Sequence, residues 1–275
     1  MPPRQGHRYS GRVAKRRLDA LLADRGLYES RSRAAAAVIA GDVRLAPGGQ
    51  LADKPGRMVT DDVALEVAER PAFVSRGGVK LANALDAFAL DVAGRRCLDA
   101  GASTGGFTDC LLQRGAAAVV AADVAYGELH WKIRQDERVT VMERTNVKEL
   151  DPASLPYAPD LIVADLSFIS LHKVLPALTA GAAVAFDCLI MVKPQFEVGR
   201  DKVGKGGVVR DPGLRRGALV SVGEAAQGLG LEVLGYASSG LPGPKGNRES
   251  FVRLAEAGRA GAVDDLYNAA RRAEP

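Results

Sequence analysis

The sequence lacks the features that usually identify secreted, membrane-spanning and metal-binding proteins. Its three cysteines, Cys97, Cys110 and Cys188, lie far apart without metal-ligand spacing, so we expect neither a disulfide framework nor a cysteine-bound metal. No stretch approaches the roughly 18 uncharged apolar residues that a membrane-spanning helix needs, and no apolar run follows the basic start, as it would in a signal peptide. We therefore expect a cytoplasmic protein that binds no metal ion and does not associate with a membrane. The sequence indicates no protein partner.

The chain does contain enough apolar material for a folded core. Hydrophobic residues make up 47% of its 275 residues and charged residues 25%, which is typical of globular proteins. This length accommodates an α/β domain of about 200 residues together with one small further domain.

Positive charge is concentrated at one end of the chain. Residues 1–57 contain 12 Lys and Arg against 5 Asp and Glu, a net of +7, whereas the remaining residues contain 25 against 28, a net of −3. A basic end suits a polyanion such as nucleic acid. Composition alone leaves a second interpretation open, namely a basic tail that is merely solvated.

Turn and helix signals divide the first 66 residues into short elements. Apolar residues recur every three or four positions around 18–22 and 34–38, which predicts two short helices. Gly26 would end the first helix, and Ser30 would cap the second. Beyond them we expect a strand over 41–45, a Pro-Gly-Gly turn at 47–49 and a strand over 59–67.

Three motifs in this segment, Arg-Leu-Asp-x-x-Leu, Ser-Arg-Ser-Arg-Ala and Gly-Asp-Val-Arg-Leu, resemble the small RNA-binding fold first seen in ribosomal protein S-four. The resemblance covers residues 16–66 and implies that arginines around the second helix grip the RNA backbone. Such contacts place a protein on folded RNA without reading much sequence. Each arginine alone is as often a solvated surface charge. The candidate RNA-binding residues are Arg16, Arg17, Arg31, Arg33 and Arg44.

Downstream of Pro71, short apolar strands alternate with helices, which predicts a mostly parallel sheet with helices on both faces. In such sheets, ligands bind at the carboxyl ends of the strands, where the strand order reverses. The seven strands that we expect are 96–102, 117–124, 139–143, 160–166, 188–193, 231–238 and 250–254.

A glycine-rich turn ends the first of these strands and leads into a helix over 108–113. The segment Leu-Asp-Ala-Gly-Ala-Ser-Thr-Gly-Gly-Phe has no Gly-Lys-Ser/Thr for a phosphate loop and no G-x-G-x-x-G for a dinucleotide. Instead, Asp99 lies inside the motif and Asp123 ends the next strand. An acid beside the loop suits an ammonium group, and an acid after the second strand suits a ribose diol. S-adenosylmethionine has both and is the expected cofactor, with a generic strand-to-helix turn as the plainer alternative.

Other residues fit the same pocket. Asn146 follows the third strand and could meet the adenine edge, although Asn is nearly as typical of a turn. The candidate cofactor-binding residues are Asp99, Gly101, Ser103, Thr104, Gly105, Phe107, Asp123, Asn146 and Asp165.

The residues after the fourth strand narrow the choice of the chemical group that accepts the methyl. The segment Asp-Leu-Ser-Phe at 165–168 lacks the two prolines with which amino-group methyltransferases hold an amine, which argues against a base nitrogen. Cys188 starts an apolar strand and Cys110 lies in a helix, so neither suits an exposed thiol nucleophile. A hydroxyl remains, and it must lose its proton to a nearby base. Two lysines and two acids can converge at one rim to do this: Lys80, Asp165, Lys193 and Glu249.

This series of four residues, set on the glycine-rich segment and on Asp-Leu-Ser-Phe-Ile-Ser, resembles the ribose methyltransferases related to FtsJ. With the N-terminal segment included, nearly the whole chain is similar to the TlyA proteins, ribosomal RNA ribose methyltransferases that are also named haemolysins. The resemblance implies a tetrad in which Lys193 is the base, Asp165 and Lys80 orient it and the acceptor, and Glu249 fixes Lys80. It also implies a cytidine 2′-hydroxyl target in the small and, for chains with a longer N-terminal end, the large ribosomal subunit, with an effect on capreomycin-type antibiotic sensitivity.

The expected fold class is therefore α/β, with a seven-stranded Rossmann-like class I methyltransferase domain over 80–275. A small α+β RNA-binding domain with a basic N-terminal extension precedes it over 1–66, and an interdomain linker joins the two over 67–79. Pro71 in that linker is suited to fixing the angle between the domains. Two other functions stay open, namely methylation of a base, and a pore-forming haemolysin or non-catalytic RNA-binding protein.

Overall fold

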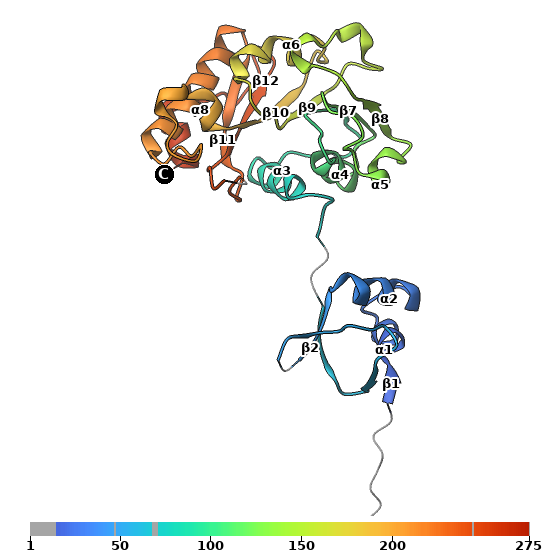
Figure 1. Ribbon diagram of the computed structural model, residues 1–275. Coiled ribbons are helices and arrows are strands. Elements are labelled where there is room, and N and C mark those ends of the chain that lie inside the picture. The colour runs from blue at the N-terminus through green and yellow to red at the C-terminus, as the bar shows by residue number, and fades with distance from the viewer. Residues whose placement is uncertain (1–14, 47, 68–70, 244, 275) are drawn as a thin grey trace, which may run out of the picture. The chain divides into compact units, whose positions relative to one another are not determined.

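The chain divides into two compact units between Arg70 and Pro71 (Figure 1). The computed structural model describes residues 15–46, 48–67, 71–243 and 245–274. The predicted basic extension before Lys15, Pro47 of the predicted turn and positions 68–70 of the predicted linker lie outside these residues. Helix α3 begins at Arg76, so part of the segment expected to be linker is helical.

The first unit packs two helices against short antiparallel strands around a small apolar core. A three-stranded sheet has the order β3-β2-β5, and β1 pairs with β4 separately. The elements are β1 (Lys15–Arg17), α1 (Leu18–Asp24), α2 (Arg31–Ala40), β2 (Val43–Ala46), β3 (Gln50–Leu51), β4 (Met58–Thr60) and β5 (Ala64–Val67).

Local signals explain most of these boundaries. The Ser30 hydroxyl accepts a hydrogen bond from the Arg33 N–H at 3.2 Å and caps α2 as expected. The single strand predicted over 59–67 is wrong, because the Val63 N–H donates to the Thr60 carbonyl at 3.1 Å and closes a turn there. The segment therefore forms two strands, β4 and β5, in different sheets.

The second unit is built on a seven-stranded sheet of order β11-β12-β10-β9-β6-β7-β8, and all seven expected strands are present. Every neighbouring pair is parallel except those made by β12. The strand order reverses beside β6, which pairs with both β7 and β9. The strands are β6 (Arg96–Ala100), β7 (Ala118–Ala122), β8 (Val139–Met142), β9 (Leu161–Ala164), β10 (Asp187–Val192), β11 (Glu232–Ser238) and β12 (Ser250–Ala255).

Helices cover both faces of this sheet (Figure 1). Alternate strand residues enter opposite cores, so that Leu98 faces one layer and Cys97 the other. The helices on the Cys97 side are α3 (Arg76–Ala87), α4 (Gly106–Gln113) and α5 (Trp131–Arg134). Those on the Leu98 side are α6 (Leu175–Ala180), α8 (Pro212–Gly228) and α9 (Leu266–Ala273). The short helix α7 (Pro194–Glu197) follows β10. Short 3₁₀ turns occupy Val147–Glu149, Pro152–Ser154, Leu171–Lys173 and Arg200–Lys202.

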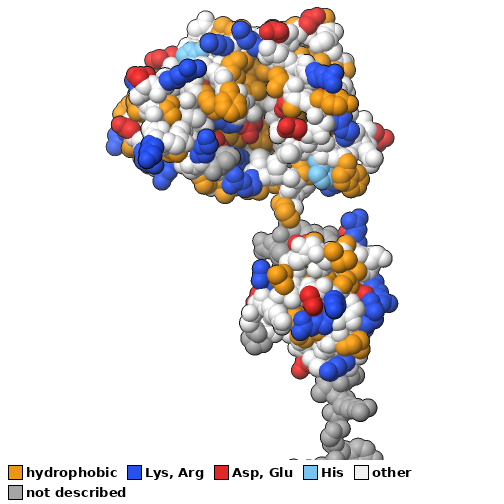
Figure 2. Space-filling view, viewed as in Figure 1, with side chains coloured by type: hydrophobic (Ala, Val, Ile, Leu, Met, Phe, Trp, Pro, Cys, Tyr) orange, Lys and Arg blue, Asp and Glu red, His pale blue; other side chains and the backbone are white. Residues whose placement is uncertain are grey.

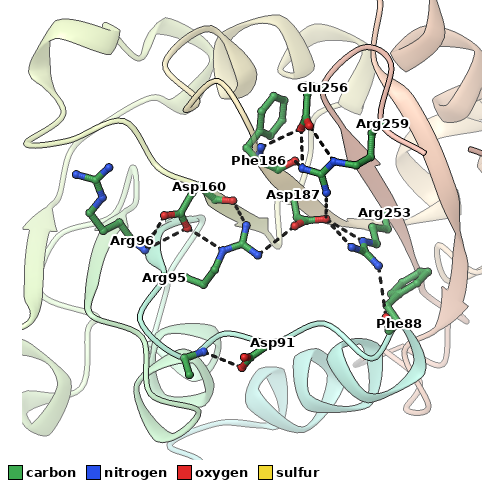
Figure 3. A network of polar contacts seen from close by, with 11 residues as sticks. Phe88, Asp91, Arg95, Arg96, Asp160, Phe186, Asp187, Arg253, Glu256 and Arg259 are labelled. Carbon is green, nitrogen blue, oxygen red and sulfur yellow. Dashed lines mark hydrogen bonds and ion pairs between the residues drawn. The ribbon is translucent and has the colours of Figure 1, made fainter. Parts of the chain in front are cut away.

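A buried carboxylate joins several chain segments at the amino edge of the sheet (Figure 3). Asp187, whose side chain is only 4% exposed, pairs with Arg253 at 2.7 Å and with Arg95 at 3.1 Å. Arg259 lies 3.6 Å from the same carboxylate. These contacts tie the starts of β6 and β10 to β12, at the edge opposite the carboxyl ends of the parallel strands. The ion pairs of Asp187 therefore do not occupy the carboxyl ends of the parallel strands, where ligands bind in such sheets.

Candidate active site

A pocket of about 590 Å³ opens in the second unit, beyond the carboxyl ends of β6, β9 and β10. Its walls come from the glycine-rich turn after β6, the segments that follow β9 and β10, the start of α3 and the β11–β12 loop. The position agrees with the rule for open parallel sheets, because the strand order reverses between β6 and its two neighbours.

Three glycines of the glycine-rich turn pack so closely against their surroundings that none of them could carry a side chain without a clash. Gly101 has φ +83°, and a Cβ there would lie 2.7 Å from the backbone carbonyl oxygen of Asp165. Gly105 has φ +92° and caps α4, which therefore begins at Gly106 rather than at the expected Thr108. A Cβ on Gly106 would collide with the Ser75 hydroxyl. The turn is thus wedged between β9 and the start of α3.

Among the expected cofactor residues, Gly101, Ser103, Thr104, Phe107 and Asp165 line the pocket. Asp99 does not line it. Its side chain is fully buried beneath the turn, where the Thr108 hydroxyl donates to Oδ2 at 2.6 Å. Burial raises the pKa of Asp99 to about 7. Its Oδ1 has no hydrogen-bond partner among the described residues.

Asp123 lies in a small adjoining recess that shares Ser103 with the main pocket. Its carboxylate accepts hydrogen bonds from the Ser103 and Ala125 N–H groups, both at 2.8 Å. Asn146 lines neither cavity. Its side chain accepts from the Lys148 N–H at 3.2 Å and donates to Glu149 at 3.1 Å, which is the turn-forming use that the sequence also allowed.

Two lysine–acid pairs line the same pocket. Lys193 Nζ lies 2.6 Å from Asp165 Oδ1 and donates to the Ser167 hydroxyl at 2.9 Å. Lys80, in the middle of α3, forms an ion pair with Glu249, and both side chains are almost fully buried. The structure therefore brings together all four residues of the expected tetrad.

Several pocket residues were not predicted from the sequence. Phe168 is 91% exposed at φ +65°, and its ring centroid lies 5.4 Å from that of Phe196. Gln195 and Asn247 also line the pocket. A non-glycine residue in the left-handed region is uncommon, but such a conformation leaves no trace in a single sequence.

Most of the candidate arginines in the first unit are engaged by neighbouring groups. Arg17 and Arg31 both pair with Asp19, at 2.7 and 3.2 Å, and the hydrogen bond from Arg17 helps to lower the pKa of that carboxyl to about 2. Arg16 pairs with Asp24 and lies 3.6 Å from Asp61, while Arg44 donates to the Gly49 carbonyl at 3.0 Å. Arg33 is exposed and has no acidic partner within ion-pair distance among the described residues.

Lys and Arg side chains are nevertheless spread over the visible face of this unit (Figure 2). The arginine–acid pairs hold several of them in defined positions.

The cysteines of the second unit are poor nucleophiles. All three are buried, and burial raises the pKa of the Cys97 and Cys110 thiols to about 12. In the part of the chain that the structure describes, no group of His, Cys, Asp and Glu side chains could hold a metal ion. Within the same residues, no helix has the length and apolar character needed to cross a membrane.

Comparison with known proteins gives consistent matches. The family of FtsJ-like methyltransferases matches residues 73–256. The 16S/23S rRNA (cytidine-2′-O)-methyltransferase TlyA of Mycobacterium tuberculosis is 54% identical over 94% of this chain and 96% of its own length. Hemolysin A of Brachyspira hyodysenteriae is 37% identical over 86% of this chain and 99% of its own. A solved structure from Streptococcus thermophilus, also given a hemolysin name, superposes with a TM-score of 0.71 at 37% identity, covering 95% of this chain and 96% of that one.

Proposed function

Because the chain belongs to the FtsJ-like methyltransferases and, within them, to the TlyA family, we propose that it is a ribosomal RNA methyltransferase. The methyl group comes from S-adenosylmethionine, and the acceptor is the 2′-hydroxyl of a cytidine. The observation that carries the proposal is the meeting of two lysine–acid pairs beside a glycine-rich turn in one pocket. An acceptor hydroxyl needs a base at such a place, and base-nitrogen chemistry would need the amine-holding prolines that this segment lacks.

The residues around the glycine-rich turn fit the proposed cofactor. Gly101, Gly105 and Gly106 have no room for a Cβ, and glycine lets a ligand approach the backbone closely. Asp123 presents a carboxylate to the adjoining recess, which suits a ribose diol. The unpaired Oδ1 of Asp99 lies beneath the turn and can accept a further hydrogen bond. When bound, S-adenosylmethionine supplies an electrophilic methyl group on its sulfonium.

The four charged residues have separate tasks in this proposal. Lys193, as the free amine, accepts the proton of the acceptor hydroxyl. Asp165, 2.6 Å away, holds the Lys193 side chain and stabilises the ammonium that forms. Glu249 fixes Lys80 in the opposite wall, from which Lys80 orients the acceptor. Phe107 and the start of α3 contribute to the lining of the same pocket.

The first unit supplies the RNA contacts in this proposal, through Arg33 and the outward faces of the paired arginines. We extend the proposal to both ribosomal subunits, to a cytoplasmic site of action and to an effect on capreomycin-type antibiotics. No observation on the described residues favours lysis of membranes as a second function.

Nucleoside analysis tests the proposal directly. The protein is incubated with each ribosomal RNA, or with isolated subunits, and methyl-labelled S-adenosylmethionine, and the RNA is digested to nucleosides. We expect 2′-O-methylcytidine, with the label retained on the ribose fragment in mass spectrometry. Label that travels with the base, or no transfer to any RNA, would refute the proposal.

A further inference from the structure

Two loops from distant parts of the sequence meet at one side of the pocket. The first, residues 203–209, forms a small hairpin closed by an antiparallel bridge between Gly204 and Val208. The second lies between β11 and β12 and is described over residues 239–243 and 245–249. Both contribute to the pocket lining, the hairpin through Val203 and Gly207 and the other loop through residues such as Asn247.

The side chain of Asn247 joins these two loops. Its Oδ1 accepts from the Val209 N–H at 2.9 Å, and its Nδ2 donates to the Gly207 carbonyl at 2.7 Å. Its own carbonyl accepts from the Gly243 N–H at 2.8 Å. Asn247 is 4% exposed, so water competes poorly for these groups. A single buried amide therefore sets the spacing of segments about 40 positions apart.

The junction also lies against the Lys80–Glu249 pair. A Cβ on Gly243 would stand 2.6 Å from Glu249 Oε1, so the loop held by Asn247 packs directly on that carboxylate. A displacement of the loop would disturb the pocket wall, even though Asn247 itself carries no charge.

Exposed cations lie on the two loops or directly beside them in the sequence, and we call this group the basic lip. Lys205 lies at the tip of the hairpin, and the Lys245 side chain reaches the hairpin, with its Cδ 4.0 Å from the place of a Cβ on Gly207. Arg248 has one acidic neighbour, Glu274, at 3.7 Å. The other four members pair with no acid among the described residues. The basic lip consists of Lys202, Lys205, Arg210, Lys245 and Arg248, all exposed.

We propose that Asn247 is a positioning residue that holds the hairpin and the β11–β12 loop together, so that the basic lip grips the RNA backbone beside the acceptor nucleotide. The inference rests on the proposed function, because it takes RNA as the substrate. Exposed cations bind phosphates and set the register of the RNA without reading its sequence. Without the amide, the same cations remain but are no longer held in one arrangement.

The dependence of RNA affinity on salt tests this inference in the full chain. The logarithm of affinity falls with the logarithm of salt concentration by about 0.7–0.9 for each phosphate neutralised. Asn247→Ala removes no charge, yet we expect it to weaken binding of an rRNA fragment about 3- to 10-fold and to make the slope shallower by about one phosphate contact. Asn268→Ala, in the exposed start of α9, is the matched control and should change nothing.

A double-mutant cycle separates positioning from general damage. Lys205→Ala should weaken RNA binding in the wild-type protein and have little further effect beside Asn247→Ala, because the lip is already loosened. Additive effects, or a wild-type salt slope in Asn247→Ala, would overturn the inference. If Asn247→Ala fails to fold, Asn247→Asp serves instead. It keeps the acceptor for Val209 and loses the donor to Gly207, and a wild-type slope there overturns the inference equally.

Failure of the proposed function gives a different result. If the affinity of the wild-type protein for RNA falls steeply with salt but the protein methylates a base, the proposed function is refuted while the inference about the basic lip is unaffected. If the wild-type protein does not bind RNA, both fall.

Discussion

Lys80 and Glu249, 169 positions apart in the sequence, form a buried ion pair in the wall of the pocket. Lys80 belongs to α3, which precedes the whole sheet, and Glu249 directly precedes β12, the last strand. Because neither charge is open to water, each depends on the other for its stabilisation. The wall of the pocket is complete only when the first helix and the last strand of this unit are both in place.

Replacing Glu249 tests this dependence. Glu249→Ala leaves Lys80 buried without a partner, and breaking such a pair costs about 3–5 kcal/mol. We expect a lower free energy of unfolding and loss of methyl transfer. Glu249→Gln keeps the shape and a hydrogen-bond acceptor, so it should lose less stability. Thermal and denaturant unfolding measure both, and equal stability of Glu249→Ala and wild type would show that the pair is not stabilising.

Lys193→Ala should remove the base while sparing cofactor binding. We expect kcat to fall by about 100-fold or more, the usual contribution of a positioned proton acceptor, with the Kd for S-adenosylmethionine nearly unchanged. Single-turnover methylation and calorimetry give the two quantities. Lys148→Ala, at an exposed position after β8, is the control. Near-normal turnover in Lys193→Ala would remove this lysine as the base.

Gly101→Ala should abolish cofactor binding because its Cβ would lie 2.7 Å from the Asp165 carbonyl oxygen. Gly258→Ala is a close control, since Gly258 has a similar φ of +78° but nothing within 4 Å of the place of its Cβ. Both changes carry the same left-handed backbone strain, and only the first has the clash. Calorimetric titration with S-adenosylmethionine distinguishes them, and equal affinities would mean that the turn relaxes freely.

Asp99 should make the stability of the ligand-free second unit depend on pH. Burial raises its folded pKa to about 7 from an ordinary 3.8, so between these values the folded state binds more proton than the unfolded state. Stability contributed by the protonated form is therefore lost as pH rises from about 4 to about 7. Asp99→Asn keeps an acceptor for Thr108 and should lack this loss. The unfolding midpoint of Asp99→Asn, measured relative to that of the wild-type protein, should therefore rise between pH 5 and pH 8. A difference in midpoint that stays constant over this range would contradict the raised pKa of Asp99.

Asp187→Asn should destabilise the second unit without affecting the chemistry. The substitution leaves Arg95, Arg253 and Arg259 facing a neutral amide at the amino edge of the sheet (Figure 3), and loss of a buried partner costs about 3 kcal/mol or more. Asp136→Asn, in a more exposed pair with Arg138, should cost less than about 1 kcal/mol. Unfolding midpoints measure the loss of stability in both variants. The Kd of Asp187→Asn for S-adenosylmethionine should be unchanged.

The sequence was sufficient to predict the sheet and the meeting of the four charged residues in one pocket. All seven strands could be recognised because each is a short apolar run bounded by turn residues. Lys193 and Asp165 could be placed together because both directly follow a parallel strand, and the carboxyl ends of parallel strands share one edge.

What the sequence could not show are contacts that depend on packing between distant segments. Asp19 lies two positions after Arg17, but nothing in the sequence indicates that the more distant Arg31 binds the same carboxylate. Asn146 was suited to a ligand and nearly as well to a turn, and only the structure shows that its side chain bonds Glu149 and the Lys148 N–H. The junction made by Asn247 requires two loops whose approach is set by the complete fold.

The reversed direction of β12 determines how firmly one member of the tetrad is held. A strand that runs against its neighbours begins where they finish, so Ser250 pairs with Val192 at the end of β10 and with Ser238 at the end of β11. Glu249 therefore enters the pocket from the root of a strand that is hydrogen-bonded on both sides. The Asp165 N–H is likewise still bonded to the Ala100 carbonyl of β6 at 3.1 Å, whereas Lys193 directly follows the end of β10. When substrate binds, adjustment should fall to Lys193, with Glu249 as the stationary reference against which it moves.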